Sequence, residues 1–172
     1  MKPEQNLILI GMSGAGKSTL GVLLAKALGK QFVDTDLLIQ QKTGKLLQEI
    51  LDTEGIDRFL EIEEEVLSSL DMTQSVISTG GSAVYSEKAM RHLKKGGVTL
   101  HLHVDYPALT KRLHNLSTRG IVFKGQSDLR GVYEDRLRLY LAYADLTVDC
   151  THNSVDDSVD QILQALSQKH GD

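Results

Sequence analysis

The stretch "GMSGAGKS", residues 11–18, decides how the rest of the sequence is interpreted. It matches the pattern G-x-x-x-x-G-K-[ST], in which a glycine-rich backbone turns its N–H groups inward around phosphate oxygens. The apolar run "NLILIG" (6–11) leads into it and predicts a buried strand. The apolar residues of 16–29 recur with helical spacing, and Gly29 is the expected helix stop. Because that helix points its positive N-terminus at the same anion, the context predicts a phosphate-binding site.

The side chains of this loop suggest specific contacts to a nucleotide. Lys17 should reach the β- and γ-phosphates, and the Ser18 hydroxyl should ligate Mg²⁺. The amide of Thr19 lies in the first helical turn, where a phosphate contact and a purely structural role are equally compatible with the sequence. A glycine-rich turn without a ligand is the disfavoured alternative. The residues expected to contact the nucleotide are Gly11, Gly14, Gly16, Lys17, Ser18 and Thr19.

The bulk properties limit the class of protein. The chain has 172 residues, which suits one domain with a sizeable core, and its net charge of -4 argues against a nucleic-acid-binding surface. No apolar run approaches the ~18 residues that span a bilayer, and residues 1–6 lack the apolar core of a signal peptide. The single cysteine, Cys150, cannot form an internal disulfide. We therefore expect a cytoplasmic protein without a nucleic-acid or membrane partner, with a monomer favoured over a dimer.

Strands and helices are predicted to alternate along the chain. We expect strands at 6–11, 31–36, 75–81, 97–105 and 146–150, and helices at 16–29, 36–52, 56–70, 86–95, 106–114, 132–144 and 154–168. Such alternation is typical of the α/β class, with a parallel sheet covered by helices on both faces. The polar, glycine-punctuated segment 115–131 remains outside this pattern.

Two acids follow the second predicted strand. In an open parallel sheet ligands bind at the carboxyl ends of the strands, where Asp34 and Asp36 flank Thr35. If the strand continues through them, both side chains lie on one face. One could hold Mg²⁺ through water, and the other could accept the proton of a substrate hydroxyl. The alternative for Asp36 is a helix N-cap before "LLIQ".

Other candidates for the site have ordinary structural alternatives. Gly80 and Gly81 end the third strand, where their amides could meet an anionic group or simply form a tight turn. Arg119 lies in the polar segment 115–131, from which a guanidinium could stabilise a transferring phosphoryl group or remain solvated. Arg136 sits on a helix beside acidic residues, so a surface position is its alternative.

Three further side chains are expected to have structural roles. Arg58 precedes Glu61 by three residues, which predicts a surface ion pair. His101 and His103 alternate on one strand and share a face, but no further metal ligands are apparent beside them.

The motifs taken together resemble a known family. In order over essentially the whole chain, "GMSGAGKST", "DTD", "EGIDRFLEIEEE", "STGGSAV", "STRG" and "RLRLY" resemble the shikimate kinase family. The resemblance implies a P-loop NTPase fold, a three-layer α/β/α sandwich with a five-stranded parallel sheet. It further implies one domain over 1–172, with substrate-binding helices at about 36–70 and a lid at about 115–131. The implied reaction transfers the γ-phosphate of ATP, with Mg²⁺, to the 3-hydroxyl of shikimate in aromatic amino acid biosynthesis.

The resemblance also implies roles by position. On the nucleotide side, Lys17 and Ser18 resemble the phosphate and magnesium residues. Arg112 resembles an arginine that stacks on adenine, Asn153 lies in a run that resembles the adenine loop, and Arg119 resembles the lid arginine.

On the acceptor side, Asp34 resembles the acid on the magnesium side, and Asp36 resembles the acid that binds substrate hydroxyls and acts as base. Gly81 resembles the glycine whose amide meets the substrate, with Gly80 beside it, and Arg136 resembles an arginine that binds the substrate carboxylate.

The substrate-binding helix departs from the family pattern G-E-x-x-F-R-x-x-E. Its first glutamate is replaced by Ile56 and its arginine by Leu60, whereas the final glutamate is kept as Glu63. Arg58 cannot substitute, because two residues along a helix turn it by about 200°. Ser82 and Gly120 are further departures, replacing a third glycine and a proline.

The loss of the arginine matters for the acceptor. A charge-assisted arginine clamp contributes about 1.5–3 kcal/mol, so shikimate should bind roughly tenfold to a hundredfold more weakly unless another group replaces it. One alternative is therefore a related kinase for another polyol or hydroxy acid, such as a gluconate-like sugar acid. A second alternative, an ATP-binding regulatory module without catalysis, is disfavoured because binding alone needs none of the acceptor-side acids.

Overall fold

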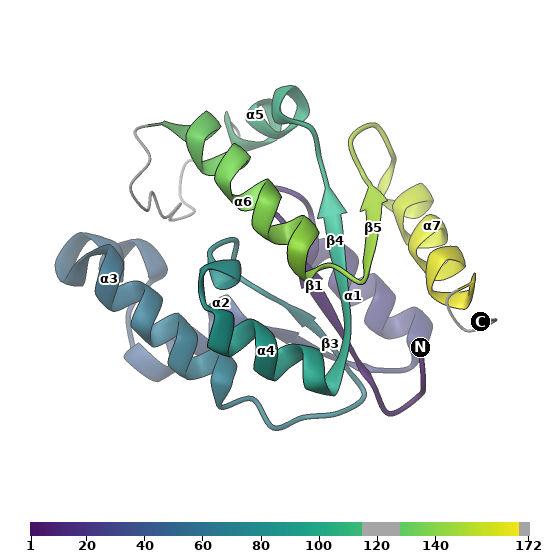
Figure 1. The fold of residues 1–172 in the computed structure, drawn as a ribbon, viewed down its shortest axis with the longest axis horizontal. Coiled ribbons are helices and arrows are strands. Elements are labelled where there is room, and N and C mark those ends of the chain that lie inside the picture. Colours follow the sequence, from purple (N-terminus) through teal and green to yellow (C-terminus); the bar gives the residue numbers. More distant parts are fainter. Residues whose placement is uncertain (115–127, 169–172) are drawn as a thin grey trace.

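The computed structural model describes residues 1–114 and 128–168, which form a five-stranded parallel sheet in the order β2-β3-β1-β4-β5 (Figure 1). All four neighbouring pairs are parallel, which confirms the predicted α/β class and strand number. The strands are β1 (Asn6–Ile10), β2 (Gln31–Asp34), β3 (Ser75–Ser78), β4 (Gly97–His103) and β5 (Leu146–Asp149).

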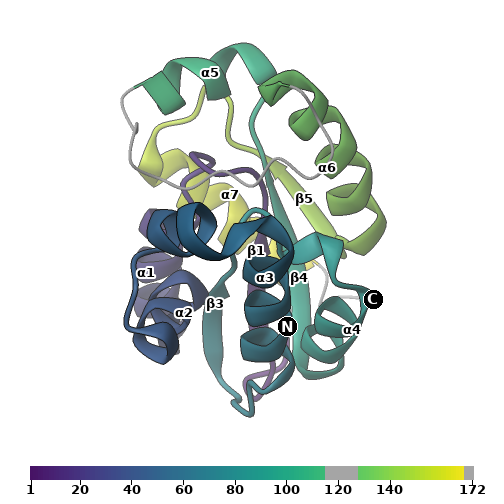
Figure 2. The same ribbon diagram turned by 90° about the vertical axis from the view of Figure 1, so that its left-hand side faces the viewer.

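Helices cover both faces of the sheet. Helices α1 and α7 contact each other on one face, whereas α4 and α6 lie on the opposite face (Figure 1). Figure 2 shows α3 in front of the sheet, with α5 beyond the carboxyl end of β4. The helices are α1 (Lys17–Leu28), α2 (Thr35–Thr43), α3 (Leu47–Ser68), the 3₁₀ helix η1 (Ala83–Tyr85), α4 (Glu87–Gly96), α5 (Tyr106–His114), α6 (Leu129–Tyr143) and α7 (Val155–Gln168). None of the helices in these described ranges is long and apolar enough to cross a bilayer.

The main core is built around the central strand β1, in which every residue is buried. A central strand with helices on both faces needs apolar side chains in both directions, which explains the continuous run of Leu7 to Ile10. A second, smaller apolar cluster packs α2 against α3; it consists of Ile39, Ile50, Phe59, Ile62 and Val66. Helices α2 and α3 therefore have a core of their own beside the sheet.

The predicted helix over 36–52 was wrong in its extent. Helix α2 ends at Thr43 because Gly44 adopts a left-handed conformation (φ 68°), and α3 begins only at Leu47. Helix α3 then continues through 53–54 and kinks at Gly55, where φ is 83° and ψ is 173°. That kink lies where a break between two helices was expected, but the two turns before it are helical.

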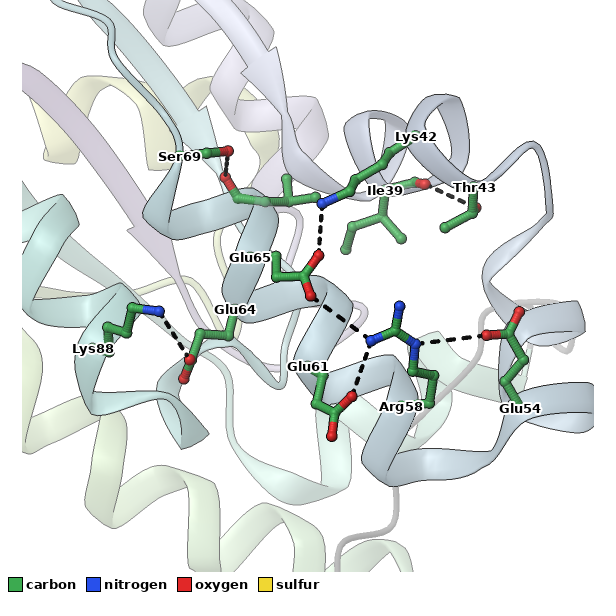
Figure 3. A network of polar contacts seen from close by, with 11 residues as sticks. Ile39, Lys42, Thr43, Glu54, Arg58, Glu61, Glu64, Glu65, Ser69 and Lys88 are labelled. Carbon is green, nitrogen blue, oxygen red and sulfur yellow. Dashed lines mark hydrogen bonds and ion pairs between the residues drawn. The ribbon is translucent and has the colours of Figure 1, made fainter.

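Charged side chains connect α2 with both halves of α3 on the solvent side (Figure 3). Arg58 lies 3.0 Å from Glu61 and 3.7 Å from Glu65, and it reaches back across the kink to within 3.9 Å of Glu54. Lys42 on α2 contacts Glu65 at 2.8 Å. The predicted surface pair of Arg58 and Glu61 is confirmed, and exposed pairs of this kind contribute little individually.

Candidate active site

The phosphate-binding loop joins β1 to α1 with an open helix N-terminus. Gly16 is the N-cap of α1 in a left-handed conformation (φ 98°, ψ 12°), and no side chain caps the first amides of the helix. Those amides are therefore available to an anion. Lys17 is buried, and its Nζ donates hydrogen bonds to the carbonyls of Gly11 at 2.7 Å and Met12 at 2.9 Å. Its ammonium group is thereby held against the loop.

Asp34 connects the loop helix with the acids after β2. Ser18 Oγ donates a 2.7 Å hydrogen bond to Asp34 Oδ2, and Asp34 Oδ1 accepts the backbone N–H of Asp36 at 3.0 Å. Strand β2 ends at Asp34, which is itself the N-cap of α2. The predicted strand through Asp36 was therefore wrong, and so was the alternative in which Asp36 is the cap. Helix geometry rather than strand alternation brings the two acids to one side.

A cavity of about 530 Å³ collects the phosphate and acid residues. Its lining residues come from the loop, the carboxyl ends of β2 and β3, and the helices α2 and α3: Ser13, Gly14, Gly16, Lys17, Ser18, Asp34, Asp36, Leu37, Gln40, Leu46, Leu47, Gln48, Thr79 and Gly81. This one cleft therefore brings together residues that were predicted to bind phosphate, magnesium and the acceptor, namely Lys17, Ser18, Asp34, Asp36 and Gly81. We refer to this cavity as the phosphate cleft.

The oxygens of the phosphate cleft fit a magnesium ion held partly by its nucleotide. Within residues 1–114 and 128–168, no group of three or more His, Cys, Asp or Glu side chains could hold a metal by itself. Mg²⁺ needs no such group, since it usually keeps several waters and binds one or two carboxylates together with substrate phosphates. The hydroxyl of Ser18 and the carboxylate of Asp34, already 2.7 Å apart, supply such oxygens.

A second cavity, of about 560 Å³, adjoins the loop on the side of α5 and α7. Its lining brings together five predicted nucleotide-binding residues, namely Gly14, Gly16, Thr19, Arg112 and Asn153. The Arg112 guanidinium donates to the carbonyls of Cys150 at 2.8 Å and Thr151 at 3.1 Å. The Asn153 amide donates to the carbonyl of Asp149 at 2.8 Å, which orders the turn after β5. These contacts shape a pocket next to the phosphate loop.

Arg136 lies behind the turn that follows β3. It is only 1% exposed, so the surface alternative for this residue was wrong. Its Nε donates to the Tyr85 hydroxyl at 3.4 Å, and its guanidinium lies 5.3 Å from the centre of the Tyr85 ring. A Cβ placed on Gly81 would lie 3.0 Å from Arg136 Nη1. Glycine at position 81 therefore lets the cation approach the backbone closely, whereas the Gly80 N–H donates to Thr35 Oγ1 at 3.3 Å.

Glu63 and Leu60 line a neighbouring cavity of about 470 Å³ rather than the phosphate cleft. Glu63 is 2% exposed, and Ser82 Oγ donates a 2.7 Å hydrogen bond to its Oε2. Burial raises the pKa of Glu63 to about 7, and nearby Asp36 adds to this rise, against the opposing effects of the Ser82 hydrogen bond, Arg136 and Lys17. Glu63 is thus a buried acid beside the turn after β3.

Two buried side chains near the site were not identified from the sequence as part of it. Tyr140 Oη donates a 2.6 Å hydrogen bond to the carbonyl of Gly81. Its spacing of four residues from Arg136 indicates that both side chains lie on one face of α6, but it does not identify the turn that they contact. His101 stacks on the Tyr140 ring at 5.1 Å, and burial lowers its pKa to about 4. His101 and His103 do share a side of β4, with ring centres 5.7 Å apart. The predicted residue Arg119 lies outside the described ranges.

Comparison with known proteins identifies the family. A family model described as "Shikimate kinase" matches residues 13–167. The chain belongs to the shikimate kinase family. Shikimate kinases from Actinobacillus succinogenes and Thiobacillus denitrificans are 32% and 37% identical to it; the alignments cover 99% and 90% of this chain and 100% and 86% of theirs. A solved structure of shikimate kinase from Acinetobacter baumannii superposes with a TM-score of 0.84 at 28% identity, covering 96% of this chain and 94% of that one.

The family membership confirms the predicted reaction class. The chain is an ATP-dependent phosphotransferase that acts on a hydroxyl group of a small molecule. It is therefore an enzyme rather than a non-catalytic regulatory module.

Proposed function

We propose that this enzyme transfers the γ-phosphate of ATP to the 3-hydroxyl of shikimate. The observation that carries the proposal is the phosphate cleft, in which Lys17, Ser18, Asp34, Asp36 and Gly81 line one cavity. The superposed relative from Acinetobacter baumannii was solved in complex with shikimate, which supports the same acceptor for this chain.

On the nucleotide side, the loop amides and Lys17 bind the phosphates, and the pocket beside Arg112 and Asn153 receives the base. Lys17 is already buried at the start of α1, so its ammonium group needs little further desolvation when the phosphates bind. Ser18 and Asp34 would hold Mg²⁺, which would supply charge neutralisation on the phosphate oxygens. Arg119 would add a further cation to the transferring group.

On the acceptor side, Asp36 accepts the proton of the attacking hydroxyl, whose oxygen forms the new bond to phosphorus as the bond to the ADP oxygen breaks. Asp36 lies in the first turn of α2 and lines the same cleft as Lys17, so the base and the phosphate site share one cavity. The Gly81 amide and the buried Arg136 guanidinium behind it bind the acceptor carboxylate. Arg136 takes this role without a second arginine, because position 60 is leucine.

The proposal is tested by following ADP release with ATP, Mg²⁺ and shikimate, and by identifying the product with ³¹P NMR. We expect turnover of ~1–100 s⁻¹, as in ordinary kinases. Asp36→Asn should remove most of this turnover while leaving ATP binding intact. Turnover with gluconate or another hydroxy acid, but none with shikimate, would contradict the proposed acceptor and support a related kinase instead.

A further inference from the structure

Glu63 has one carboxyl oxygen that is satisfied and one that is not. Ser82 Oγ donates to Oε2 at 2.7 Å, whereas Oε1 is buried without a hydrogen-bond partner among residues 1–114 and 128–168. A buried polar atom without a partner costs free energy, so native proteins rarely keep one without a use. The free oxygen therefore calls for a polar partner from outside the described part of the chain.

The free oxygen lies beside Gly80, on the side of that residue where Asp36 also lies. A Cβ placed on Gly80 would lie 3.0 Å from Asp36 Oδ1 and closer still to Glu63 Oε1. Both carboxyl oxygens thus face the same space above Gly80, next to Gly81 in the wall of the cleft. A molecule whose hydroxyl reaches Asp36 would place its neighbouring atoms beside Glu63.

Ser82 is the side chain that orients this carboxyl. Leu60, one turn earlier on α3, contributes no charge, and no ion pair joins Glu63 to a cation among the described residues. Ser82 as a whole residue is only 5% exposed, so its hydrogen bond to Oε2 is shielded from water. Without that donor both oxygens would lack a partner, and the carboxyl would rotate toward another one.

We propose that Ser82 is a positioning residue that holds Glu63 Oε1 toward the acceptor, where Glu63 binds a hydroxyl adjacent to the one that Asp36 receives. The enzyme would then require an acceptor with neighbouring hydroxyls, and Ser82 with Glu63 would select for it. This inference rests on the proposed function, because it assumes that the acceptor enters beside Asp36.

A matched pair of serines tests the proposal. Ser86 is the second serine of the same turn region and donates at 2.6 Å to Oε2 of Glu64, the neighbour of Glu63 on the outer side of α3. Ser86 also caps α4 through the Ala89 N–H at 3.0 Å, so Ser86→Ala loses hydrogen bonds and stability. Each alanine variant therefore removes a serine hydroxyl that donates to a glutamate of α3. Ser82→Ala removes the donor to Glu63, and Ser86→Ala removes the donor to Glu64.

The affinity for shikimate is measured in two ways: as KM in the assay of ADP release, and as Kd by calorimetry. The calorimetric Kd reports binding without turnover. We expect Ser82→Ala to raise KM and Kd for shikimate about tenfold, the worth of one well-placed hydrogen bond, and to leave KM for ATP unchanged. Ser82→Thr should restore the affinity, since it keeps the hydroxyl. Ser86→Ala should lower Tm without raising either constant for shikimate.

A second arm uses shikimate analogues that lack the 4- or the 5-hydroxyl. The 4-hydroxyl is the neighbour of the 3-hydroxyl, so wild type and Ser82→Ala should have equal affinity for the analogue that lacks the 4-hydroxyl. For the analogue that lacks the 5-hydroxyl, Ser82→Ala should still bind more weakly than wild type. Three results would overturn the proposal: equal losses of shikimate affinity in the two alanine variants, parallel rises in KM for ATP and shikimate in Ser82→Ala, or an undiminished effect of Ser82→Ala on the analogue that lacks the 4-hydroxyl. Shikimate binding without turnover in the wild type would contradict only the proposed reaction, whereas no binding at all would contradict both.

Discussion

Ser18 Oγ on α1 donates a 2.7 Å hydrogen bond to Asp34 Oδ2 at the end of β2. The same carboxyl accepts the backbone N–H of Asp36 through its other oxygen, at 3.0 Å. One side chain therefore connects the phosphate-binding helix with the first turn of α2, which carries the proposed base. Any group that binds to Ser18 and Asp34 is thereby coupled to the position of Asp36.

Asp34→Asn should weaken the response to magnesium more than the response to ATP. The amide keeps the shape and can still cap α2, but it removes the negative charge that a hard cation prefers. We expect the Mg²⁺ concentration for half-maximal activity to rise about 10- to 100-fold. A titration of Mg²⁺ at constant free ATP measures this.

The control for that prediction is Asp145→Asn, which removes the 3.1 Å ion pair between Asp145 and Lys94 just before β5. This change should alter stability slightly and leave the magnesium titration unchanged. Identical magnesium dependence in wild type and Asp34→Asn would show that Asp34 is not on the metal side.

The strands, the phosphate loop and the edge of the sheet that carries the site could be predicted because each has a local signal. The apolar run of β1 ends directly at the loop, and parallel topology then places Asp34, Asp36 and Gly81 at one edge. The residue types and their order along the chain were sufficient for this part.

The contacts that orient the acceptor side could not be predicted, because they join residues distant in sequence. Glu63 and Ser82 are 19 positions apart, and Tyr140 and Gly81 are 59 apart.

The end of α2 was missed for a different reason. Apolar residues continue with helical spacing past Gly44, and only the left-handed backbone there shows that the helix stops.

Leu60→Arg should improve the affinity for shikimate. Leu60 lines the 470 Å³ cavity together with Glu61, Glu63 and Glu64, so an arginine there would have acidic neighbours to pair with and space to occupy. A second guanidinium near the acceptor carboxylate should lower KM for shikimate roughly 10- to 100-fold, with KM for ATP unchanged. Steady-state kinetics at saturating ATP measure the change.

Arg58→Leu is the matched control for Leu60→Arg, because Arg58 lies on the opposite, solvent-facing side of α3 in the ion-pair network of Figure 3. It should leave KM for shikimate unchanged. If Leu60→Arg leaves it unchanged as well, position 60 does not determine how the acceptor is held.

Gly55→Asn should destabilise the protein more than Gly44→Asn. Neither position has an atom within 4 Å of an added Cβ, so the difference between them is one of backbone conformation. Gly44 is left-handed (φ 68°, ψ 13°), a conformation that asparagine tolerates, whereas Gly55 (φ 83°, ψ 173°) is in a region that essentially only glycine adopts. We expect Gly55→Asn to cost about 1–3 kcal/mol in urea unfolding. Equal losses for the two variants would show that the kink is not what requires glycine.

His101 should make the folded state less stable as the pH falls. Burial lowers its pKa to about 4, with His103 and Lys17 adding to the effect, so the unfolded chain takes up a proton near pH 6.5 while the folded state does not. The free energy of unfolding that His101 contributes is therefore complete above about pH 6.5 and is lost progressively toward pH 4, by about 3 kcal/mol in total. His101→Phe keeps a ring against Tyr140 and cannot be protonated. In urea unfolding at constant ionic strength, the difference between variant and wild type should grow in favour of the variant from pH 6.5 to 4. The titration of Glu63 affects wild type and variant alike, so it cancels in the difference between their free energies of unfolding. If those free energies change in parallel with pH, His101 does not cause this pH dependence.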